Sequence, residues 1–301
     1  MIGKPVVGMG QCSWDLLGRV AEYPRVDEKA ELLDLVEQGG GPVATALVTL
    51  ARLGAKTKFF GTIGADNYGT RIADGLGAAG VDISQLQIDP AGSSQLAFIA
   101  VEQQQGRRNI FCHRGARRPF CLNERGRQDI VAAAALLLDG TEPAAAHEAA
   151  RLAQGCQVPV VLDGGSLREG TLDLLPYCNH LVVSQKFAGQ LCRGGTDAAL
   201  DRLLDFGAEV AVVTLGARGC IARDRAGARI ECPVFDVGVV DTTGCGDVFH
   251  GGYLYGLLTG QTLTERLRFA SACAALKAEQ PGGRQGIPEL VEVEKLLGSC
   301  R

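Results

Sequence analysis

The sequence predicts an α/β fold in which helices cover both faces of a parallel β-sheet. Short apolar runs alternate with segments whose apolar residues recur at helical spacing through most of the 301 residues. Such strand–helix–strand alternation makes neighbouring strands parallel and places the connecting helices on both faces of the sheet. The expected strands cover residues 5–10, 56–64, 135–140, 158–164, 180–184 and 210–216. Helical spacing is found in PVATALVTLARLG, EPAAAHEAARLAQ and TDAALDRLLDFG.

Two segments break this alternation. Residues 19–38 and 94–113 contain ELLDLVEQ and QLAFIAVE, in which apolar and polar residues alternate without an intervening helix. This period of two is typical of strands and predicts a small separate sheet. No internal repeat and no long linker divides the chain, so residues 1–301 are expected to form a single domain.

The composition is that of a globular protein. Hydrophobic residues make up 46% and charged residues 21% of the chain, and the formal net charge is −4. These values exclude general disorder and argue against a nucleic-acid or membrane-surface partner. The eleven cysteines form no metal-binding spacing, and Cys156, Cys220 and Cys273 lie among small apolar residues as expected for buried thiols. A reduced, cytoplasmic protein with a small-molecule partner is the simplest interpretation.

The stretch VVGMGQCSWD follows the first expected strand. Gly8 and Gly10 suggest a dinucleotide fingerprint, but Ser13 stands where the third glycine belongs, so an NAD-dependent enzyme is a poor interpretation. Asp15 is a lone acid just past the strand. It is either a turn residue or a carboxylate at the carboxyl edge of the sheet, where α/β ligands bind.

A second glycine cluster opens a helix in QGGGPVATALVTLARLG. Pro42 suits the first helical position and Gly54 suits the end of the helix. The three glycines at 39–41 are either a simple turn or a place where a ligand approaches the backbone closely.

The strongest pattern is DTTGCGDVFHGG, which precedes an apolar, helix-like run. A glycine-rich turn that leads into a helix leaves backbone N–H groups free and adds positive charge from the helix dipole. The N–H groups of Gly244, Cys245, Gly246 and Asp247 are therefore expected to form an anion hole for a phosphoryl group. Asp247 could simply complement the helix dipole; the stronger interpretation makes it the general base that deprotonates an attacking hydroxyl.

These motifs resemble the PfkB-type carbohydrate kinases of the ribokinase-like family. DTTGCGDVFHGG is similar to the family's C-terminal signature, GGGPVATALVTLARLGAKTKFFGTIGADNYG to its N-terminal signature, and VVTLGARG to its nucleotide site. The resemblance spans essentially the whole chain and implies a three-layer, Rossmann-like parallel sheet flanked by helices, with a small β-sheet lid at about residues 19–38 and 94–118.

The resemblance also implies roles for individual residues. Asp15, Gly40 and Gly41 would hold sugar hydroxyls, and Asp241 with Thr243 would help to hold a monovalent cation such as K⁺. Mg²⁺ is expected to arrive with ATP and to bridge its phosphates. The residues implied at the ATP site are Ser184, Thr214, Gly216 and Gly219.

The chain departs from the family pattern at three places. Thr45 stands where many members carry an Asn that grips the sugar. Ser184 and Phe187 replace the Asn and Glu of an N-x-x-E pattern near the metal and phosphates, which puts the usual metal dependence in doubt. Cys245 replaces the common Ala, and its thiol is either inert or a thiolate favoured by the helix N-terminus.

Basic residues concentrate in RRNIFCHRGARR, residues 107–118. This segment is either a solvated lid edge or, with Lys29 and His113, a cover over an anionic substrate such as a sugar acid, sugar phosphate or sulfonated sugar. The stretches GGGPVATA, GDVFHGG and PGGRQGIP partly resemble sulfofructose kinases. A ketohexose, 2-keto-3-deoxygluconate and a phosphorylated ketose remain open. The alternatives are a nucleoside kinase of the same fold and a non-catalytic sugar or nucleotide sensor. Analogy with the family also suggests a homodimer formed through the lid.

Overall fold

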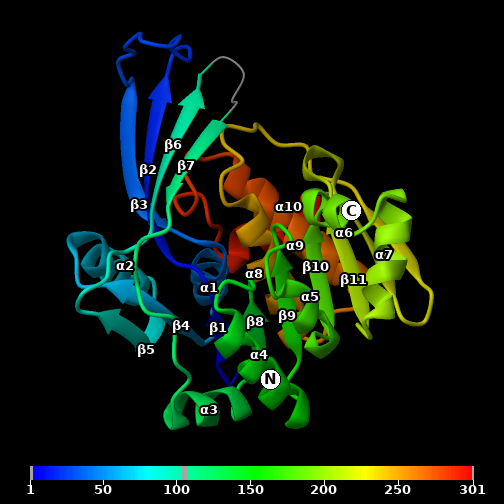
Figure 1. Ribbon diagram of the computed structural model, residues 1–301. Coiled ribbons are helices and arrows are strands. Elements are labelled where there is room, and N and C mark those ends of the chain that lie inside the picture. The colour runs from blue at the N-terminus through cyan, green and yellow to red at the C-terminus, as the bar shows by residue number, and fades with distance from the viewer. Residues whose placement is uncertain (1–2, 104–107, 300–301) are drawn as a thin grey trace.

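The computed structural model describes residues 3–103 and 108–299, which form two β-sheets and the helices around them (Figure 1). The larger sheet has nine strands in the order β13-β12-β11-β10-β9-β8-β1-β4-β5. These strands are β1 (Val6–Met9), β4 (Thr57–Gly64), β5 (Val81–Asp89), β8 (Ala135–Leu138), β9 (Val160–Gly164), β10 (His180–Ser184), β11 (Val210–Thr214), β12 (Cys220–Asp224) and β13 (Arg229–Cys232).

Most of the larger sheet is parallel, which confirms the predicted fold class. The pairings from β5 through β4, β1, β8, β9 and β10 to β11 are parallel, whereas β11–β12 and β12–β13 are antiparallel. All six expected strands are present. The sequence analysis missed β5, β12 and β13, which lie at or near the two edges and mix buried residues with partly or fully exposed ones instead of forming continuous apolar runs.

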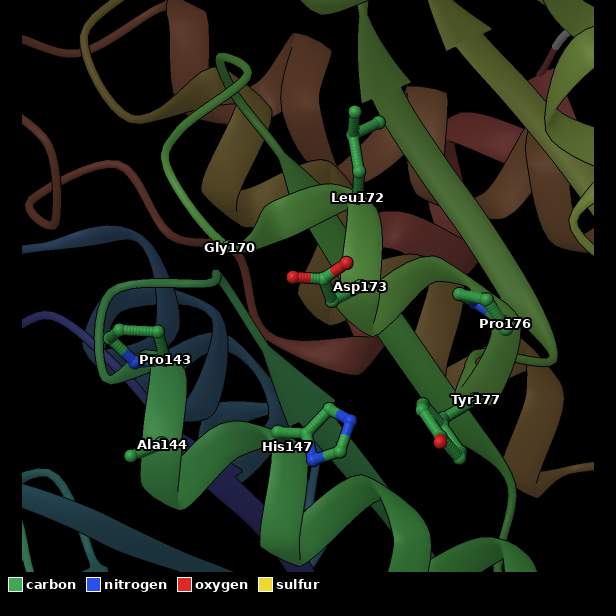
Figure 2. Close-up of a pocket in the computed structure, with 8 residues that line it drawn as sticks. All are labelled: Pro143, Ala144, His147, Gly170, Leu172, Asp173, Pro176 and Tyr177. Carbon is green, nitrogen blue, oxygen red and sulfur yellow. The ribbon is translucent and has the colours of Figure 1, made fainter.

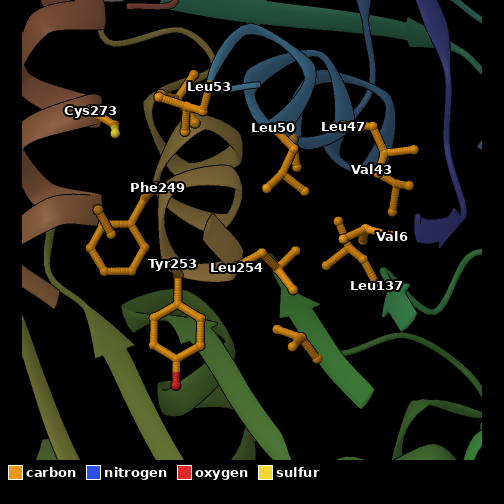
Figure 3. Packing of buried hydrophobic residues seen from close by; sticks show 14 of the residues in the cluster. Val6, Val43, Leu47, Leu50, Leu53, Leu137, Phe249, Tyr253, Leu254 and Cys273 are labelled. Carbon is orange, nitrogen blue, oxygen red and sulfur yellow. The ribbon is translucent and has the colours of Figure 1, made fainter. Parts of the chain in front are cut away.

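Helices cover both faces of this sheet. Alternate residues of each strand point to opposite faces, so Val6 belongs to one apolar cluster and Val7 to the other. The first cluster joins the sheet to α1, α8 and α9, and Figure 3 shows Leu50, Phe249 and Leu254 packing there. The helices are α1 (Pro42–Arg52), α2 (Asn67–Ala78), α3 (Glu124–Val131), α4 (Pro143–Gly155), α5 (Thr171–Leu174), α6 (Gln185–Leu191), α7 (Gly195–Asp205), α8 (Cys245–Leu258), α9 (Leu263–Ala278) and α10 (Leu290–Ser299).

The smaller sheet stands apart from the larger one (Figure 1) and has the order β3-β2-β6-β7. Its strands are β2 (Ser13–Val20), β3 (Asp34–Gly40), β6 (Leu96–Glu102) and β7 (Arg108–His113). The central pair β2–β6 is parallel and the outer pairs are antiparallel. The predicted lid segments contain β3, β6 and β7, but β2 begins at Ser13, well before residue 19. The division of the chain into one domain with these lid boundaries stays a prediction.

The strand order reverses at β1, since β4 lies on one side of it and β8 on the other. Ligands of open α/β sheets bind beyond the carboxyl ends of the strands at such a switch point. Here the Gln11 N–H donates to Asp139 Oδ2 at 2.8 Å, which joins the ends of β1 and β8. The fold therefore points to this edge for the site.

Cys220 and Cys273 are buried as expected, but Cys156 is exposed. It follows the end of α4, where its apolar neighbours face the sheet and its own side chain does not. No helix within residues 3–103 and 108–299 has the length and apolar content needed to cross a bilayer.

Candidate active site

The turn before α8 is built around Gly244. Its backbone φ of 75° lies in the left-handed region, and a Cβ there would be 2.7 Å from the Gly283 carbonyl oxygen, so only glycine fits. The Cys245 N–H donates to the Thr242 carbonyl at 3.3 Å. The first helical bond then runs from the Val248 N–H to the Gly244 carbonyl at 2.9 Å. Gly246 and Asp247, which lie between Cys245 and Val248, belong to the first turn of the helix.

Those two residues, Gly246 and Asp247, have N–H groups without a backbone acceptor in the described part of the chain. They lie at the positive end of the α8 dipole. The expected contribution from Cys245 is weakened, because its N–H already serves Thr242. Burial raises the pKa of the Cys245 thiol and outweighs the opposing charge of Lys277. The structure thus favours an inert thiol at this position.

Asp241 fixes the same turn through its carboxylate. Oδ1 accepts from the Thr243 N–H at 2.8 Å and from the Thr243 hydroxyl at 2.7 Å, and Oδ2 accepts from the Gly282 N–H at 2.8 Å. Burial alone would raise the pKa of Asp241, but these hydrogen bonds outweigh it and lower the pKa. Asp241 is therefore a structural carboxylate that accepts bonds on both oxygens.

Three further aspartates gather at the carboxyl ends of the strands: Asp247 at the start of α8, Asp163 at the end of β9 and Asp15 on β2. Burial is the first cause that raises the pKa of each of them. The charges of Asp163 and Asp15 add to the rise in the pKa of Asp247, while Arg284 opposes it. A carboxylate with a raised pKa is a stronger base than an exposed one, which suits proton abstraction.

His250 links Asp163 to the turn. Its Nδ1 lies 2.7 Å from the Gly246 carbonyl oxygen and 3.3 Å from Asp163 Oδ2, and its Nε2 lies 3.0 Å from the Val182 carbonyl oxygen. His250 thus lies between the Asp163 carboxylate and the Gly246 peptide, an arrangement that the sequence analysis did not foresee.

Asp15 lies against the glycine cluster before α1. It is 8% exposed, and its Oδ1 accepts from the Ser13 hydroxyl at 2.7 Å. A Cβ on Gly40 would lie 2.0 Å from Asp15 Oδ2, and a Cβ on Gly41 would lie 2.5 Å from the Gln11 carbonyl oxygen. The structure thus brings the predicted Asp15, Gly40 and Gly41 together, and the glycines make room for the carboxylate and for the β1 loop.

Arg284 is the main residue of this site that the sequence analysis missed. Its Nε donates to Thr45 Oγ1 at 3.3 Å, its Nη2 to the Gly40 carbonyl at 3.0 Å, and its backbone N–H to Gln38 Oε1 at 3.0 Å. Burial lowers the pKa of Arg284 to about 10, and the charges of Asp15 and other nearby groups oppose this change. Thr45, expected to stand in for a sugar-gripping Asn, instead orients this guanidinium.

Two predicted lid residues do not reach this arrangement. Lys29 is exposed in the connection between β2 and β3. Strand pairing aligns His113 with Leu96 and Trp14, whereas Asp15 aligns with Ala97 and Cys112. Side chains of directly paired residues share a face, so His113 lies on the face opposite to Asp15. The placement of His113 at the substrate mouth is corrected, and Cys112 occupies the row of Asp15.

The basic segment is largely engaged elsewhere. Arg117 Nη1 lies 2.7 Å from Glu142 Oε1, and Arg118 pairs with Asp89 at 3.7 Å. Arg108 hydrogen-bonds to the Thr242 hydroxyl, which connects the lid to the turn before α8. Arg107 lies outside the described residues. Three arginines of this segment thus contact protein groups, whereas Arg114 is exposed, so an arginine cover over the substrate stays a prediction.

The predicted ATP residues lie on neighbouring strand ends. Ser184 and Thr214 are directly paired at the ends of β10 and β11. Ser184 caps α6, accepting from the Phe187 N–H at 3.1 Å and donating to the Gly165 carbonyl at 2.8 Å. Gly216 and Gly219 have φ of 61° and 82°, which favour glycine in this turn. They border the same edge of the sheet as the aspartates.

A different hollow of about 620 Å³ lies beside α4 and α5 (Figure 2). Its walls include Pro143, His147, Asp173 and Tyr177, and the rings of His147 and Tyr177 meet edge to face at 4.9 Å. None of the predicted site residues lines it. The candidate active site is therefore the edge where α8 begins.

Comparison with known proteins agrees with this fold. Residues 4–290 match the pfkB family carbohydrate kinase model. A ribokinase of Schizosaccharomyces pombe is 28% identical over 307 residues, covering 96% of each chain. A 5-dehydro-2-deoxygluconokinase of Shouchella clausii is 29% identical over 314 residues, covering 97% of this chain and 95% of that protein. The structure of Arabidopsis thaliana ribokinase complexed with ribose and ATP superposes with a TM-score of 0.88, at 24% identity and 98% coverage of each chain.

A parallel α/β sheet with a small second sheet and a glycine-rich helix start is the arrangement expected of a phosphotransferase that acts on an alcohol. The chain belongs to the pfkB family of carbohydrate kinases. It is an ATP-dependent carbohydrate kinase of the ribokinase type, as the sequence analysis predicted, which sets aside the non-catalytic sensor.

Proposed function

We propose that this kinase transfers the γ-phosphoryl group of ATP to a hydroxyl of a sugar-like substrate that carries an anionic group. The observation that carries the proposal is the position of Asp247 at the start of α8. Its carboxyl group has a raised pKa, and its own N–H and that of Gly246 point from the helix N-terminus without backbone partners. A base and an anion-binding helix start are thereby joined in one turn.

In this mechanism Asp247 takes the proton of the acceptor hydroxyl as that oxygen attacks the γ-phosphorus, and the bond from the γ-phosphorus to the bridging oxygen breaks to release ADP. The N–H groups of Gly246 and Asp247, with that of Gly244, receive the charge that spreads over the phosphoryl oxygens. The Nδ1 atom of His250 lies 2.7 Å from the Gly246 carbonyl oxygen, and this contact helps to keep the peptide in position. Gly244 supplies the left-handed turn that starts the helix.

ATP would lie along the ends of β10 and β11, where Ser184 and Thr214 are paired and Gly216 and Gly219 shape the next turn. Among the described residues, no three His, Cys, Asp or Glu side chains converge as a metal site. Mg²⁺ would enter with the nucleotide as part of the MgATP substrate and would neutralise charge on the phosphates. The absence of an Asn and a Glu at positions 184 and 187 agrees with this.

The anionic group is proposed from Arg284. Its guanidinium donates to the Thr45 hydroxyl and the Gly40 carbonyl, which are both neutral, so its charge is available to a substrate anion. Asp15, 8% exposed, would accept from the sugar hydroxyls nearby. A planar guanidinium matches a carboxylate, phosphate or sulfonate with two parallel hydrogen bonds. The arginines of residues 108–118 add less, because Arg117 and Arg118 already pair with carboxylates.

The test is ADP release and product mass across a panel of candidate acceptors with MgATP. The panel contains ribose, ketohexoses, their phosphates, 2-keto-3-deoxygluconate, sulfofructose and nucleosides. We expect turnover with a sugar acid, sugar phosphate or sulfosugar, and a product heavier by one phosphoryl group. Turnover only with neutral sugars would remove the anionic part of the proposal, and turnover only with nucleosides would replace the sugar by a nucleoside.

A further inference from the structure

Lys277 is a fully buried lysine directly behind the turn that begins α8. It lies near the end of α9 and has 0% exposure. Its ammonium donates to the Asp241 carbonyl at 2.8 Å and to the Gln280 carbonyl at 3.4 Å. Burying a charge destabilises the fold unless hydrogen bonds compensate for the lost water. The bonds to these two carbonyls provide that compensation for Lys277.

The ammonium of Lys277 lies where the segment at residue 241 meets the loop after α9. Main-chain carbonyl oxygens and a carboxylate converge on the segment between residue 241 and the loop that follows α9. The N–H groups of Val240 and Asp241 also bond to the Ala278 carbonyl, at 2.8 and 3.1 Å. These contacts tie the C-terminal end of α9 to the start of the 241–247 turn. The ammonium of Lys277 lies at the junction.

The oxygens that the sequence analysis assigned to a bound K⁺ already accept hydrogen bonds from other groups of the protein. Both carboxylate oxygens of Asp241 accept from N–H or O–H groups of Thr243 and Gly282, and its main-chain oxygen accepts from Lys277. A hard cation needs several free oxygens. It would also be repelled by an ammonium at the same carbonyl. Asp241 and Thr243 therefore do not fit a K⁺ site in this chain.

We propose that the ammonium of Lys277 replaces the monovalent cation: it holds the 241–247 turn in its anion-binding shape, and the kinase works without K⁺. Lys277 is a positioning residue, since it acts through the Asp241 carbonyl. Its charge also lies close enough to influence Cys245 and Asp247. The proposal depends on the proposed function only for its activity measurement, because the salt dependence of unfolding tests it separately.

The first test uses the wild-type enzyme in chloride salts of K⁺, Na⁺ and tetramethylammonium at equal ionic strength. We expect initial rates within about twofold of one another and thermal midpoints that do not differ, because a specific bound ion would stabilise the fold by mass action. A rate at least about tenfold higher in K⁺, or a midpoint that rises with K⁺ alone, would overturn the proposal.

The second test removes the ammonium in Lys277→Met, with Lys277→Gln as the variant to use if Met does not fold. We expect kcat to fall by about 10²-fold, as misplaced catalytic groups do. Added NH₄⁺ or K⁺ should restore part of the rate and raise the thermal midpoint, whereas tetramethylammonium should not, because it is too large for the vacated space. A variant with wild-type kcat, or with a loss that no small cation repairs, would contradict the role of Lys277.

Lys58→Met is the matched control. Lys58 is also buried, at 7% exposure, but its ammonium pairs with Asp82 at 3.2 Å and Asp129 at 3.0 Å, near the amino ends of the strands. We expect this variant to lose stability without any difference between K⁺, NH₄⁺ and tetramethylammonium. An ion-specific recovery in Lys58→Met equal to that in Lys277→Met would show a general salt effect and would overturn the proposal.

Discussion

Carboxylates at two places in this molecule have pKa values shifted in opposite directions. At the antiparallel edge, Asp197 lies 2.9 Å from Arg223 and 2.7 Å from Arg229, and the hydrogen bond from Arg229 lowers its pKa. At the carboxyl ends of the parallel strands, burial raises the pKa of both Asp15 and Asp247. The edge carboxylate is paired with cations, and the site carboxylates are packed near one another.

The difference in pKa indicates that the site carboxylates are suited to accept a proton. A carboxylate paired with arginine is held in its ionised form and is a poor base, whereas a buried one near other negative charges takes up a proton readily. Such crowding destabilises the fold, and natural proteins accept that where function requires it. The comparison predicts large effects on activity from changes at the site and small effects on stability from changes at the edge.

The largest effect is expected from Asp247→Asn, which removes the base but keeps the shape of the side chain. Turnover should fall by about 10²–10⁴-fold, the usual contribution of general base catalysis. ATP affinity, measured by calorimetry, should stay close to that of the wild type. The thermal midpoint at pH 7 should be equal or higher by about 2–4 °C, because a buried ionised carboxylate no longer has to be accommodated. Turnover like that of the wild type would remove Asp247 from the mechanism.

The next largest effect is expected from Arg284→Met. Loss of a hydrogen bond to a charged group should lower kcat/KM for an anionic acceptor by about 100-fold, and much less for a neutral sugar. Arg114→Met, at an exposed position of the basic segment, is the control and should change neither value. Equal losses for anionic and neutral acceptors would mean that Arg284 orients the loop and does not bind the anionic group of the substrate.

The smallest effect is expected from Asp197→Asn at the antiparallel edge. This ion pair is solvated, since the Asp197 side chain is 53% exposed, and exposed pairs contribute little. The thermal midpoint should fall by no more than about 2 °C, and the difference from the wild type should shrink in high salt. A drop as large as that of Lys58→Met would show that the edge network matters more to the fold than the comparison allows.

Much of the fold was predictable because many of its strands and turns have recognisable local sequence patterns. The apolar runs of β1, β8, β9, β10 and β11 are buried on both faces, and such strands need no alternation to be recognised. The glycine-rich turn with Asp247 was predictable for the same reason, since its requirement for positive φ lies within a few residues. Edge strands β5, β12 and β13 follow weaker patterns and were missed.

The missed features depend on contacts between distant parts of the chain. Arg284 becomes a site residue only because the fold brings it to Thr45 and to the Gly40 carbonyl. Lys277 is one of three basic residues in α9, and only the fold shows that its ammonium donates to the Asp241 carbonyl. The error at His113 has another cause: a shift of one residue in strand register moves a side chain to the opposite face, and the sequence does not fix the register of β6 with β7.

The central claim is that Asp247 is a base because its carboxyl group is left unpaired and its pKa is raised. The pH dependence of kcat/KM tests it most directly, since this parameter reports the ionisation of the free enzyme. The base must be ionised, so the rate should fall as pH drops through the pKa of Asp247, which burial and the neighbouring carboxylates raise well above the ordinary value of an aspartate. In Arg284→Met the fall should begin at higher pH, because Arg284 lowers the pKa of Asp247. A rate that stays constant down to about pH 4, measured with an acceptor that does not itself titrate in this range, would contradict the account.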